Sequence, residues 1–329
     1  MKKKAAMNHV AKKIFYMPLW LIHYLVSNLT LTDKRIFARL RNYFPTYLST
    51  WNEFRNQLNR MFRIPLVYKV QSAHIELTNV CNLKCKHCTP QNLKGSRRGM
   101  MDFSLFKKII DQLTDLKVAV LSWNGESFLH PKFFEMCRYA KDRGIYVIIY
   151  TNGTCLTPEN IEKVFASGVA ELDVSVDGIN DVYENNRGFD YHILKNNLLN
   201  LLEARKRLGY PITILLTATN LPNDESCREQ LVAEWGDKVD YIHFAHLMGE
   251  KIKLRNKTCK TIFRHAAISW DGKVCPCVND MQQSMLFDEI DGNKKIIDII
   301  NSTQAQEYRL RHIKKQFEGV CKYCDEFYG

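Results

Sequence analysis

Short apolar runs alternate with amphipathic runs along most of this 329-residue chain. An apolar run fits a buried strand, and apolar residues at helical spacing fit a helix that packs on it. The predicted strands are residues 75–78, 118–123, 145–153, 170–178, 212–220 and 241–248. Strands that alternate with helices predict an α/β fold with a parallel sheet. Six strands are two fewer than an eightfold barrel needs, so we expect a partial (β/α)6 TIM-like barrel that is incompletely closed.

Helix boundaries follow the usual sequence signals. Thr157 and Pro158 predict a capped helix start, and Gly144 predicts a helix end. The predicted helices are residues 101–116, 131–144, 157–168, 191–209 and 225–236. The strands between them should be buried on both faces, and therefore rich in Val, Ile and Leu. Functional residues are expected at the carboxyl ends of the strands, where parallel sheets gather their chemistry.

Three cysteines follow the first predicted strand with the spacing C-x3-C-x2-C: Cys81, Cys85 and Cys88. A zinc site normally needs a fourth ligand, for which only His87 is at hand, and a redox dithiol needs two cysteines. Three thiolates suit a four-iron four-sulfur cluster with one iron not bound by protein. The chain has eleven cysteines, an odd and clustered set, which favours ligands over disulfides and predicts a reducing compartment.

This spacing in this strand context resembles the radical S-adenosylmethionine superfamily. The resemblance implies that the unligated iron binds the amino and carboxylate groups of S-adenosylmethionine. It also implies that the reduced cluster cleaves the sulfonium to a 5'-deoxyadenosyl radical, which abstracts a substrate hydrogen. A one-electron donor such as flavodoxin or ferredoxin is then an expected partner.

Other strand ends agree with the resemblance. The stretch SWNGES keeps the Gly-Glu pair of the family's G-G-E-P motif, and the T-N-G and S-V-D-G stretches end the third and fourth strands. The cofactor-binding residues implied in this way are Gly125, Glu126, Asn152, Ser175, Asp177 and Arg187. Glu126 would accept from the cofactor ammonium, and Ser175 and Asp177 would lie near its ribose. Arg187 would anchor a carboxylate or the substrate, unless it is an exposed loop residue.

Cysteines return beyond residue 250. The pattern C-x12-G-x4-C from Cys259 to Cys277 resembles the SPASM and twitch extensions of the same superfamily, with DGKV as a hairpin turn. Five cysteines fit the shorter twitch form with one auxiliary 4Fe-4S cluster. The assigned ligands are Cys259, Cys277, Cys321 and Cys324, although Cys275 could replace Cys277. A zinc ribbon is the structural alternative. Residues 294–317 are predicted to form one helix before the last cysteine pair.

The N-terminal segment carries nearly all of the net charge. Residues 1–70 hold 13 Lys or Arg and two acids, a net charge of +11 out of the +12 of the whole chain. Residues 71–329 are therefore nearly neutral and give no reason to expect nucleic-acid binding. No formal charge occurs between Lys13 and Asp33, but polar residues dilute this stretch too much for a clear membrane span. A helix in the membrane interface and a helical extension packed on the barrel both fit. Residues 50–62 predict a second helix, with Thr50 and Glu53 as a capping box.

The sequence therefore predicts three parts: a basic, aromatic helical extension (1–70), a radical S-adenosylmethionine partial barrel (71–250) and an auxiliary cluster domain (251–329). The leading hypothesis is a cytoplasmic radical oxidoreductase, peripheral to the inner membrane face if its first segment binds lipid. Its substrate would be a small molecule, sugar or peptide, and the auxiliary cluster would accept an electron. A peptide-modifying maturase, a radical methyltransferase and a non-catalytic iron-sulfur or zinc scaffold are the alternatives.

No catalytic acid or base can be assigned from the sequence. His243, His246 and Glu250 near the sixth strand are candidates for pocket residues, but a histidine in a strand is more often structural. The remaining cysteines, at positions 137, 155 and 227, are expected to be ordinary buried residues.

Overall fold

A computed structural model describes residues 55–56, 58–88, 97–220, 225–246, 255–291 and 294–324, all within one compact unit, Thr46–Gly329. Its described strands are β1 Ser72–Ile75, β2 Val118–Val120, β3 Tyr146–Thr151, β4 Glu171–Ser175, β5 Thr213–Asn220, β6 Tyr241–His246, β7 His265–Ile268, β8 Lys273–Cys275 and β9 Asp288–Glu289. Its described helices are α5 Phe103–Gln112, α6 Phe133–Lys141, α7 Pro158–Ser167, α8 Asn180–Arg187, α9 Tyr191–Leu208, α10 Glu225–Trp235, α11 Ile296–Ile300 and α12 Thr303–Ile313, with short 3-10 turns η2 Ser127–Leu129, η3 Thr261–Phe263 and η4 Gly319–Lys322.

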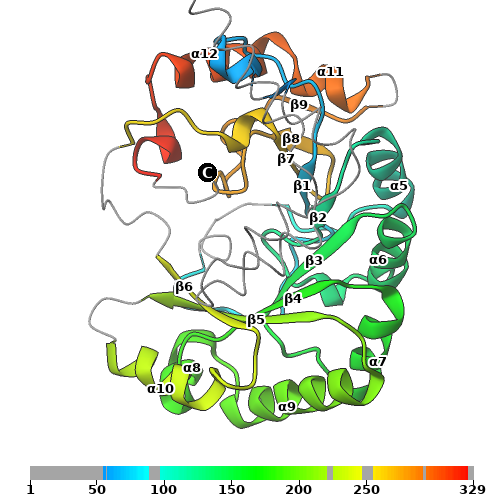
Figure 1. Cartoon of the computed structure of the whole chain (residues 1–329), viewed down its shortest axis with the longest axis vertical. Helices are drawn as coiled ribbons and strands as arrows, with labels where there is room; N and C mark the ends of the chain where they lie inside the picture. The colour runs from blue at the N-terminus through cyan, green and yellow to red at the C-terminus, as the bar shows by residue number, and fades with distance from the viewer. Residues whose placement is uncertain are drawn as a thin grey trace, which may run out of the picture. The chain divides into compact units, whose positions relative to one another are not determined.

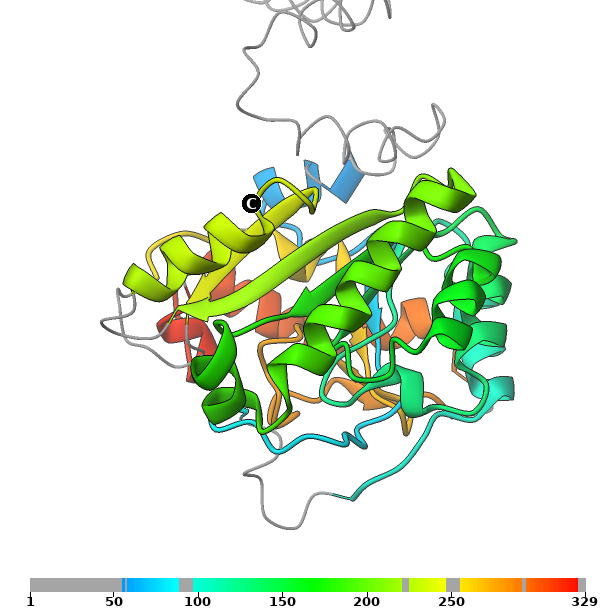
Figure 2. The same cartoon turned by 90° about the horizontal axis from the view of Figure 1, so that it is seen from below.

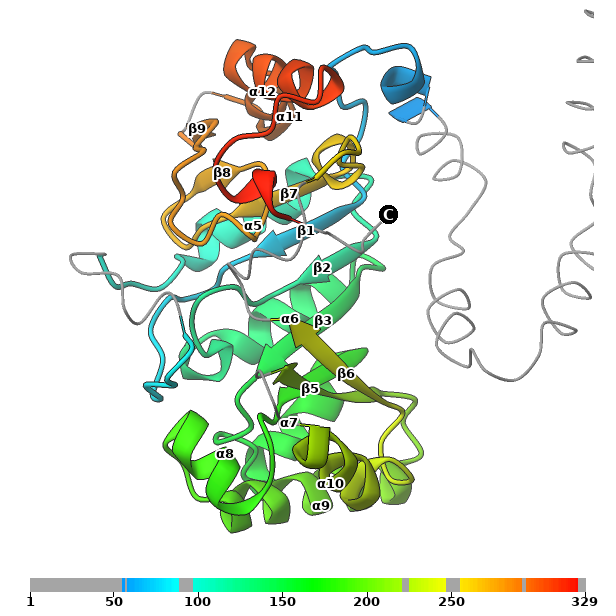
Figure 3. The same ribbon diagram turned by 90° about the vertical axis from the view of Figure 1, so that its left-hand side faces the viewer.

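All described strands join one sheet in the order β6-β5-β4-β3-β2-β1-β7-β8-β9 (Figure 1). The six predicted strands are confirmed as neighbouring parallel strands, and the sheet is not closed. Strand β7, from the C-terminal part of the chain, pairs in parallel with β1, so β1 lies between β2 and β7 (Figure 3). The remaining strands β8 and β9 are antiparallel, and the predicted DGKV hairpin turn joins β7 to β8.

Local signals begin and end the helices as expected. The Thr157 hydroxyl accepts a hydrogen bond from the backbone N–H of Asn160 at the start of α7, which confirms the predicted cap. The helix ends at Gly168, whose φ of +77° is a conformation that glycine adopts without strain. At α5 the same capping role belongs to Asp102.

The two faces of the curved sheet differ in character. Helices α5, α6, α7 and α9 cover the outer face (Figure 2), and outward residues such as Leu172 and Val174 are fully buried against them. The alternate residues of the same strand, Asp173 and Ser175, point to the inner face. The prediction of nearly continuous Val, Ile and Leu is therefore wrong for the inner face of β4, whereas Val118, Val120 and Ile148 form a buried apolar cluster on β2 and β3. An open barrel can keep polar side chains on the inner face, because they are not enclosed by a second layer of helices.

Most elements are shorter than predicted, and three further differences concern the arrangement of the chain. The first strand lies at Ser72–Ile75 rather than 75–78, because pairing with both β2 and β7 ends there. The helix α8 was not predicted. The single helix expected over 294–317 is two helices, since the Ser302 side chain caps a new helix and the Asn301 side chain bonds both backbone groups of Val67.

The N-terminal predictions fall largely outside the described residues. Thr50 and Glu53 of the predicted capping box lie there, as does the apolar stretch up to Asp33. Residues 58–60 are helical, as predicted, and Phe62 after them is 66% exposed. Among the helices that the structure describes, none is long and apolar enough to cross a membrane.

Candidate functional site

The first cysteine loop leaves the sheet at the carboxyl end of β1. Its backbone turns tightly, with the Cys88 N–H donating to the Cys85 carbonyl at 3.2 Å and the Lys86 N–H donating to the Asn186 carbonyl at 2.9 Å. Cys81, Cys85 and Cys88 are each half-buried, so the loop neither buries them completely nor leaves them in free solvent. Cys85 interacts electrostatically with Cys88, and Cys81 with Cys85, which places the three thiols in one neighbourhood.

Two polar side chains reach the sulfur atoms of this loop. Asn152 Nδ2 lies 3.8 Å from Cys81 Sγ, and Arg187 Nη1 lies 4.0 Å from Cys85 Sγ. Burial raises the pKa of Cys85, and the guanidinium of Arg187 acts in the opposite direction. A cation and an amide donor beside thiols favour their deprotonated form, which is the form that binds iron.

Gly125 is required by the close contact between two loops. A Cβ atom on Gly125 would lie 2.3 Å from the Thr78 carbonyl oxygen and 2.7 Å from the Val80 carbonyl oxygen. The next N–H, that of Glu126, donates to the same Val80 carbonyl at 2.9 Å. Only glycine lets the Gly-Glu loop lie against the backbone that leads into Cys81.

The Glu126 carboxylate is buried, with 1% exposure, and holds the third strand end in place. It accepts from the Asn152 N–H at 2.8 Å, the Thr151 hydroxyl at 3.0 Å and the Phe128 N–H at 3.2 Å. Burial raises the pKa of Glu126, and these donors oppose that shift. Its binding of a cofactor ammonium stays a prediction.

Asp177 and Arg187 form a buried ion pair at the fourth strand end. Arg187 Nε donates to Asp177 Oδ2 at 2.6 Å, and the Thr219 N–H donates to Asp177 Oδ1 at 2.7 Å. Arg187 ends helix α8 and its side chain is 14% exposed, so it is not the exposed loop residue considered as an alternative. Ser175 is half-buried on the inner face of β4. Of the predicted cofactor residues, all except Ser175 contact or interact with the first cysteine loop or the backbone leading into it, and their binding of the cofactor stays a prediction.

The cysteines of the C-terminal part gather around a second centre. Cys321 interacts electrostatically with Cys259 and Cys324. Asn279 links Cys277 to the same group, because its N–H lies 3.4 Å from Cys277 Sγ and its Nδ2 lies 3.5 Å from Cys324 Sγ. Four neighbouring thiols, two of them with N–H donors on their sulfur atoms, fit an iron-sulfur cluster. In the described part of the chain, no three His, Cys, Asp or Glu side chains are arranged around a single metal ion.

Cys275 has a different environment from Cys277. It lies on β8 with 1% exposure, and burial raises its pKa to about 12, helped by the carboxylates of Asp280 and Glu76. These acids disfavour a thiolate at Cys275. Cys277 instead lies near Tyr308, whose hydroxyl is hydrogen-bonded to Cys321. The geometry favours Cys277 over Cys275 as the ligand.

One short segment touches both centres. The indole Nε1 of Trp123 donates to the Val278 carbonyl at 2.8 Å, directly after Cys277. One residue later, the Asn124 N–H donates to the Glu76 carboxylate, which also accepts from the Trp270 N–H in the β7–β8 hairpin. The loop that carries Gly125 is therefore tied to the C-terminal cysteine domain by hydrogen bonds on two sides.

The buried Glu76 should make stability depend on pH. Burial raises its pKa to about 7 from 4.5, so its proton is bound more tightly in the folded state. The contribution of Glu76 to the free energy of unfolding is greatest below pH 4.5 and falls as the pH rises to 7. Relative to Glu76→Gln, the wild-type free energy of unfolding should fall by about 3 kcal/mol over that range and then stay level. Urea unfolding of both proteins at pH 4.5 to 8 measures this, with the exposed Glu135→Gln as control. Parallel curves for wild type and Glu76→Gln would contradict it.

The remaining predicted residues give mixed outcomes. Cys137 and Cys227 are buried as expected, but Cys155 is half-buried and interacts with Cys81 and Glu126. His243 is exposed on strand β6, and the side chain of His246 and residue 250 lie outside the description.

Sequence reasoning missed Glu76, Trp123, Asn279 and Tyr308. A glutamate inside the apolar run IELT is a signal that was available, because a buried carboxylate needs donors. Nothing in the local sequence distinguishes the other three from ordinary surface or core residues. Their partners in these contacts lie 155, 45 and 13 residues away in the chain, and the fold brings them together.

Two family models match this chain. The radical SAM superfamily model matches residues 75–231, and an iron-sulfur cluster-binding domain, SPASM, matches residues 259–325. The chain belongs to the radical SAM superfamily. Its cofactors are those of the two domains: a 4Fe-4S cluster with S-adenosylmethionine, and auxiliary iron-sulfur ligation in the SPASM domain.

Parts of several curated proteins are similar to this chain. An AdoMet-dependent heme synthase of Methanosarcina barkeri is 33% identical over 172 residues, which is 51% of this chain and 49% of that protein. Mycofactocin maturase MftC of Mycobacterium tuberculosis is 30% identical over 151 residues, 44% of this chain and 38% of that protein. The radical SAM chain thus matches about half or less of the length of these relatives.

Solved structures share the fold. Streptococcus suis SuiB bound to precursor peptide SuiA has a TM-score of 0.63 at 12% identity, covering 86% of this chain and 77% of that one. BtrN in complex with AdoMet and 2-DOIA has a TM-score of 0.54 at 20% identity, covering 80% and 95%. At these identities the likeness supports the partial barrel architecture alone.

Proposed function

We propose that this radical SAM protein is an oxidoreductase that removes a hydrogen atom from its substrate and passes an electron to an auxiliary cluster. The observation that carries this is the pair of separate cysteine centres tied together by the segment from Trp123 to Asn124. Three thiols belong to the first centre. Four belong to the second, so its ligation can be completed by the protein, which suits electron transfer better than substrate binding.

The residues of the first centre would have different roles in binding the cluster and S-adenosylmethionine. Cys81, Cys85 and Cys88 would bind a 4Fe-4S cluster, and the Arg187 cation beside Cys85 stabilises a ligating thiolate. When bound, the reduced cluster supplies one electron to the sulfonium of S-adenosylmethionine, whose carbon–sulfur bond breaks to give methionine and a 5'-deoxyadenosyl radical. Gly125 keeps the neighbouring backbone close enough to line the same site.

Cys259, Cys277, Cys321 and Cys324 would hold the auxiliary cluster. A substrate that has lost a hydrogen atom to the 5'-deoxyadenosyl radical must lose one more electron and one proton to become a two-electron oxidation product. The electron would pass to the auxiliary centre, and the proton to water or a nearby base. A flavodoxin or ferredoxin would restore the electron of the first centre.

The test is anaerobic reconstitution with iron and sulfide, reduction, and addition of S-adenosylmethionine. We expect iron for two clusters per chain and formation of 5'-deoxyadenosine. Deuterium transfer from candidate small molecules, sugars or peptides into 5'-deoxyadenosine then identifies the substrate class. If the chain binds iron for one cluster together with zinc, the auxiliary cluster is excluded. If both clusters are filled and S-adenosylmethionine is still not cleaved, the proposed radical chemistry is excluded.

A peptide-modifying maturase is the second candidate. It is favoured by the similarity to a mycofactocin maturase and by the shared fold with SuiB, which was solved with a precursor peptide. Deuterium transfer from a peptide and not from small molecules would select it.

We also propose that the segment before β1 binds an anionic membrane surface. Residues 55–70 hold four cations and no acid, and Met61 and Phe62 are 64% and 66% exposed. Cations beside exposed apolar side chains suit the interface of an anionic bilayer.

The expected result is recovery of the chain with phosphatidylserine liposomes, which decreases with added salt. The double change Met61→Ser and Phe62→Ser should lower the recovery several-fold, since it removes apolar area from the interface. Leu199→Ser with Val232→Ser is the matched control, because these side chains are exposed on other helices. Equal recovery of both double variants in sedimentation would count against this membrane face.

A further inference from the structure

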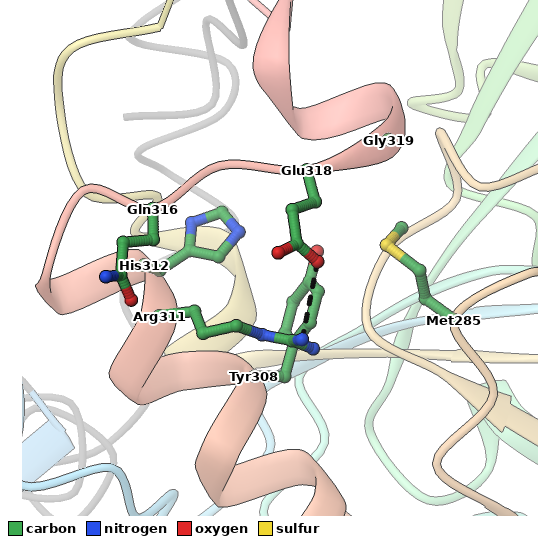
Figure 4. A pocket seen from close by; sticks show the side chains of 7 residues that line it. All are labelled: Met285, Tyr308, Arg311, His312, Gln316, Glu318 and Gly319. Atoms are coloured by element: carbon green, nitrogen blue, oxygen red, sulfur yellow. Dashed lines mark hydrogen bonds and ion pairs between the residues drawn. The ribbon is translucent and has the colours of Figure 1, made fainter.

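Tyr308 is the closest polar neighbour of an auxiliary-centre sulfur atom among the contacts described. It lies in α12 with 7% exposure, and its hydroxyl oxygen is 2.9 Å from Cys321 Sγ. Its ring packs against those of Phe287 and His312, with centroids 5.8 and 5.0 Å away. Figure 4 shows Tyr308 and His312 together in the wall of a cavity of about 180 Å³.

The direction of this hydrogen bond follows from the chemistry of the partner. A cysteine that ligates iron has lost its proton, so the phenol must donate and the sulfur must accept. The phenol of Tyr308 has one O–H proton to give, and Cys321 Sγ is the hydrogen-bond partner described for it. His312 does not compete for that proton, since neither of its ring nitrogens has a hydrogen-bond partner in the described structure.

The other donors described near this centre reach other sulfur atoms. Asn279 approaches Cys277 and Cys324 at 3.4 and 3.5 Å, and Arg255 interacts with Cys324. The contact from Tyr308 is half an ångström shorter than the shorter Asn279 contact, and both Tyr308 and Cys321 are buried, where a hydrogen bond is electrostatically stronger than in water.

We propose that the Tyr308 hydroxyl raises the reduction potential of the auxiliary cluster by hydrogen bonding to Cys321, and so suits that cluster to accept an electron from the substrate radical. A donor on a ligating sulfur withdraws electron density and stabilises the reduced cluster. This inference rests on the proposed function, because it requires an auxiliary cluster at Cys259, Cys277, Cys321 and Cys324. Tyr308 is a positioning and tuning residue, since it acts through Cys321.

The test is a redox titration followed by electron paramagnetic resonance in the full chain with Cys81, Cys85 and Cys88 changed to alanine, so that only the auxiliary cluster contributes. Tyr308→Phe keeps the ring packing and removes the donor. Its midpoint potential should shift to a more negative value. Tyr191→Phe is the matched control: Tyr191 is equally buried, but its hydroxyl bonds to Glu234 and Trp235.

A second variant covers the case in which Tyr308→Phe does not assemble its cluster. Incorporation of 3-fluorotyrosine at position 308 keeps the donor and makes it more acidic, so the midpoint should move to a more positive value. An assembled cluster with the same midpoint in the parent and in either 308 variant would overturn the inference and leave the auxiliary cluster standing. A parent that binds no iron at all would overturn the auxiliary cluster, and this inference with it.

Discussion

Changing Cys81, Cys85 and Cys88 together to alanine should abolish the formation of 5'-deoxyadenosine. In the proposed function these three thiolates bind the first cluster, and alanine removes all of them. Cys155 interacts with Cys81, but one thiol cannot replace three. The expected rate is indistinguishable from the reaction without protein, measured by chromatography after anaerobic reduction with S-adenosylmethionine.

The same variant should keep the iron of the second centre, because the four cysteines there have their own donors in Asn279 and Tyr308. Cys137→Ala is the matched control: Cys137 is fully buried among helix and strand residues, so its loss should cost about 1 kcal/mol of stability and leave cleavage intact. Persistent cleavage in the triple variant would refute the assignment of the first centre.

Arg309→Met should destabilise the protein by about 3–5 kcal/mol. Arg309 is 1% exposed and donates to the carbonyls of Ile262 at 2.8 Å, Pro65 at 3.1 Å and Ile300 at 2.7 Å. Burial lowers its pKa to about 10, which still leaves it charged at neutral pH. Methionine fills much of the volume but leaves three carbonyl oxygens without their donor.

Arg311→Met is the control for this change. Arg311 lies two residues later in α12, and its ion pair with Glu318 is exposed on both sides, so its loss should cost less than about 1 kcal/mol. Urea unfolding of the anaerobic proteins gives both differences. If Arg309→Met lowers the free energy of unfolding no more than Arg311→Met does, the three hydrogen bonds of Arg309 do not stabilise the fold.

The periodic pattern of the sequence was enough for the barrel strands and most of their helices. Each parallel strand is a local apolar run, and signals such as Thr157 and Gly168 mark helix ends within a few residues. The break between α11 and α12 could not be predicted in the same way. Asn301 leaves the helical pattern because its side chain bonds Val67, which is 234 residues away in the chain.

The hydrogen-bond donors around the two cysteine centres also could not be predicted from the sequence pattern. Asn152 and Arg187 were expected to face the cofactor, yet their described contacts include Cys81 and Cys85. Asp177 binds Arg187 and the Thr219 N–H in the same structure. A family resemblance identifies which residues gather at the strand ends. The hydrogen-bond geometry shows which of them contact other protein groups.

The sequence by itself determined the family, the cofactor chemistry and the order of the six barrel strands. These properties follow from residue type and from spacing along the chain, which are local. Only the tertiary structure decided that β7 continues the barrel sheet beside β1, and that Trp123, Glu76 and Tyr308 lie at the cysteine centres. The contacts of Trp123 and Glu76 join segments separated by more than a hundred residues, and that of Tyr308 joins α12 to η4, so none of them follows from a local periodic pattern.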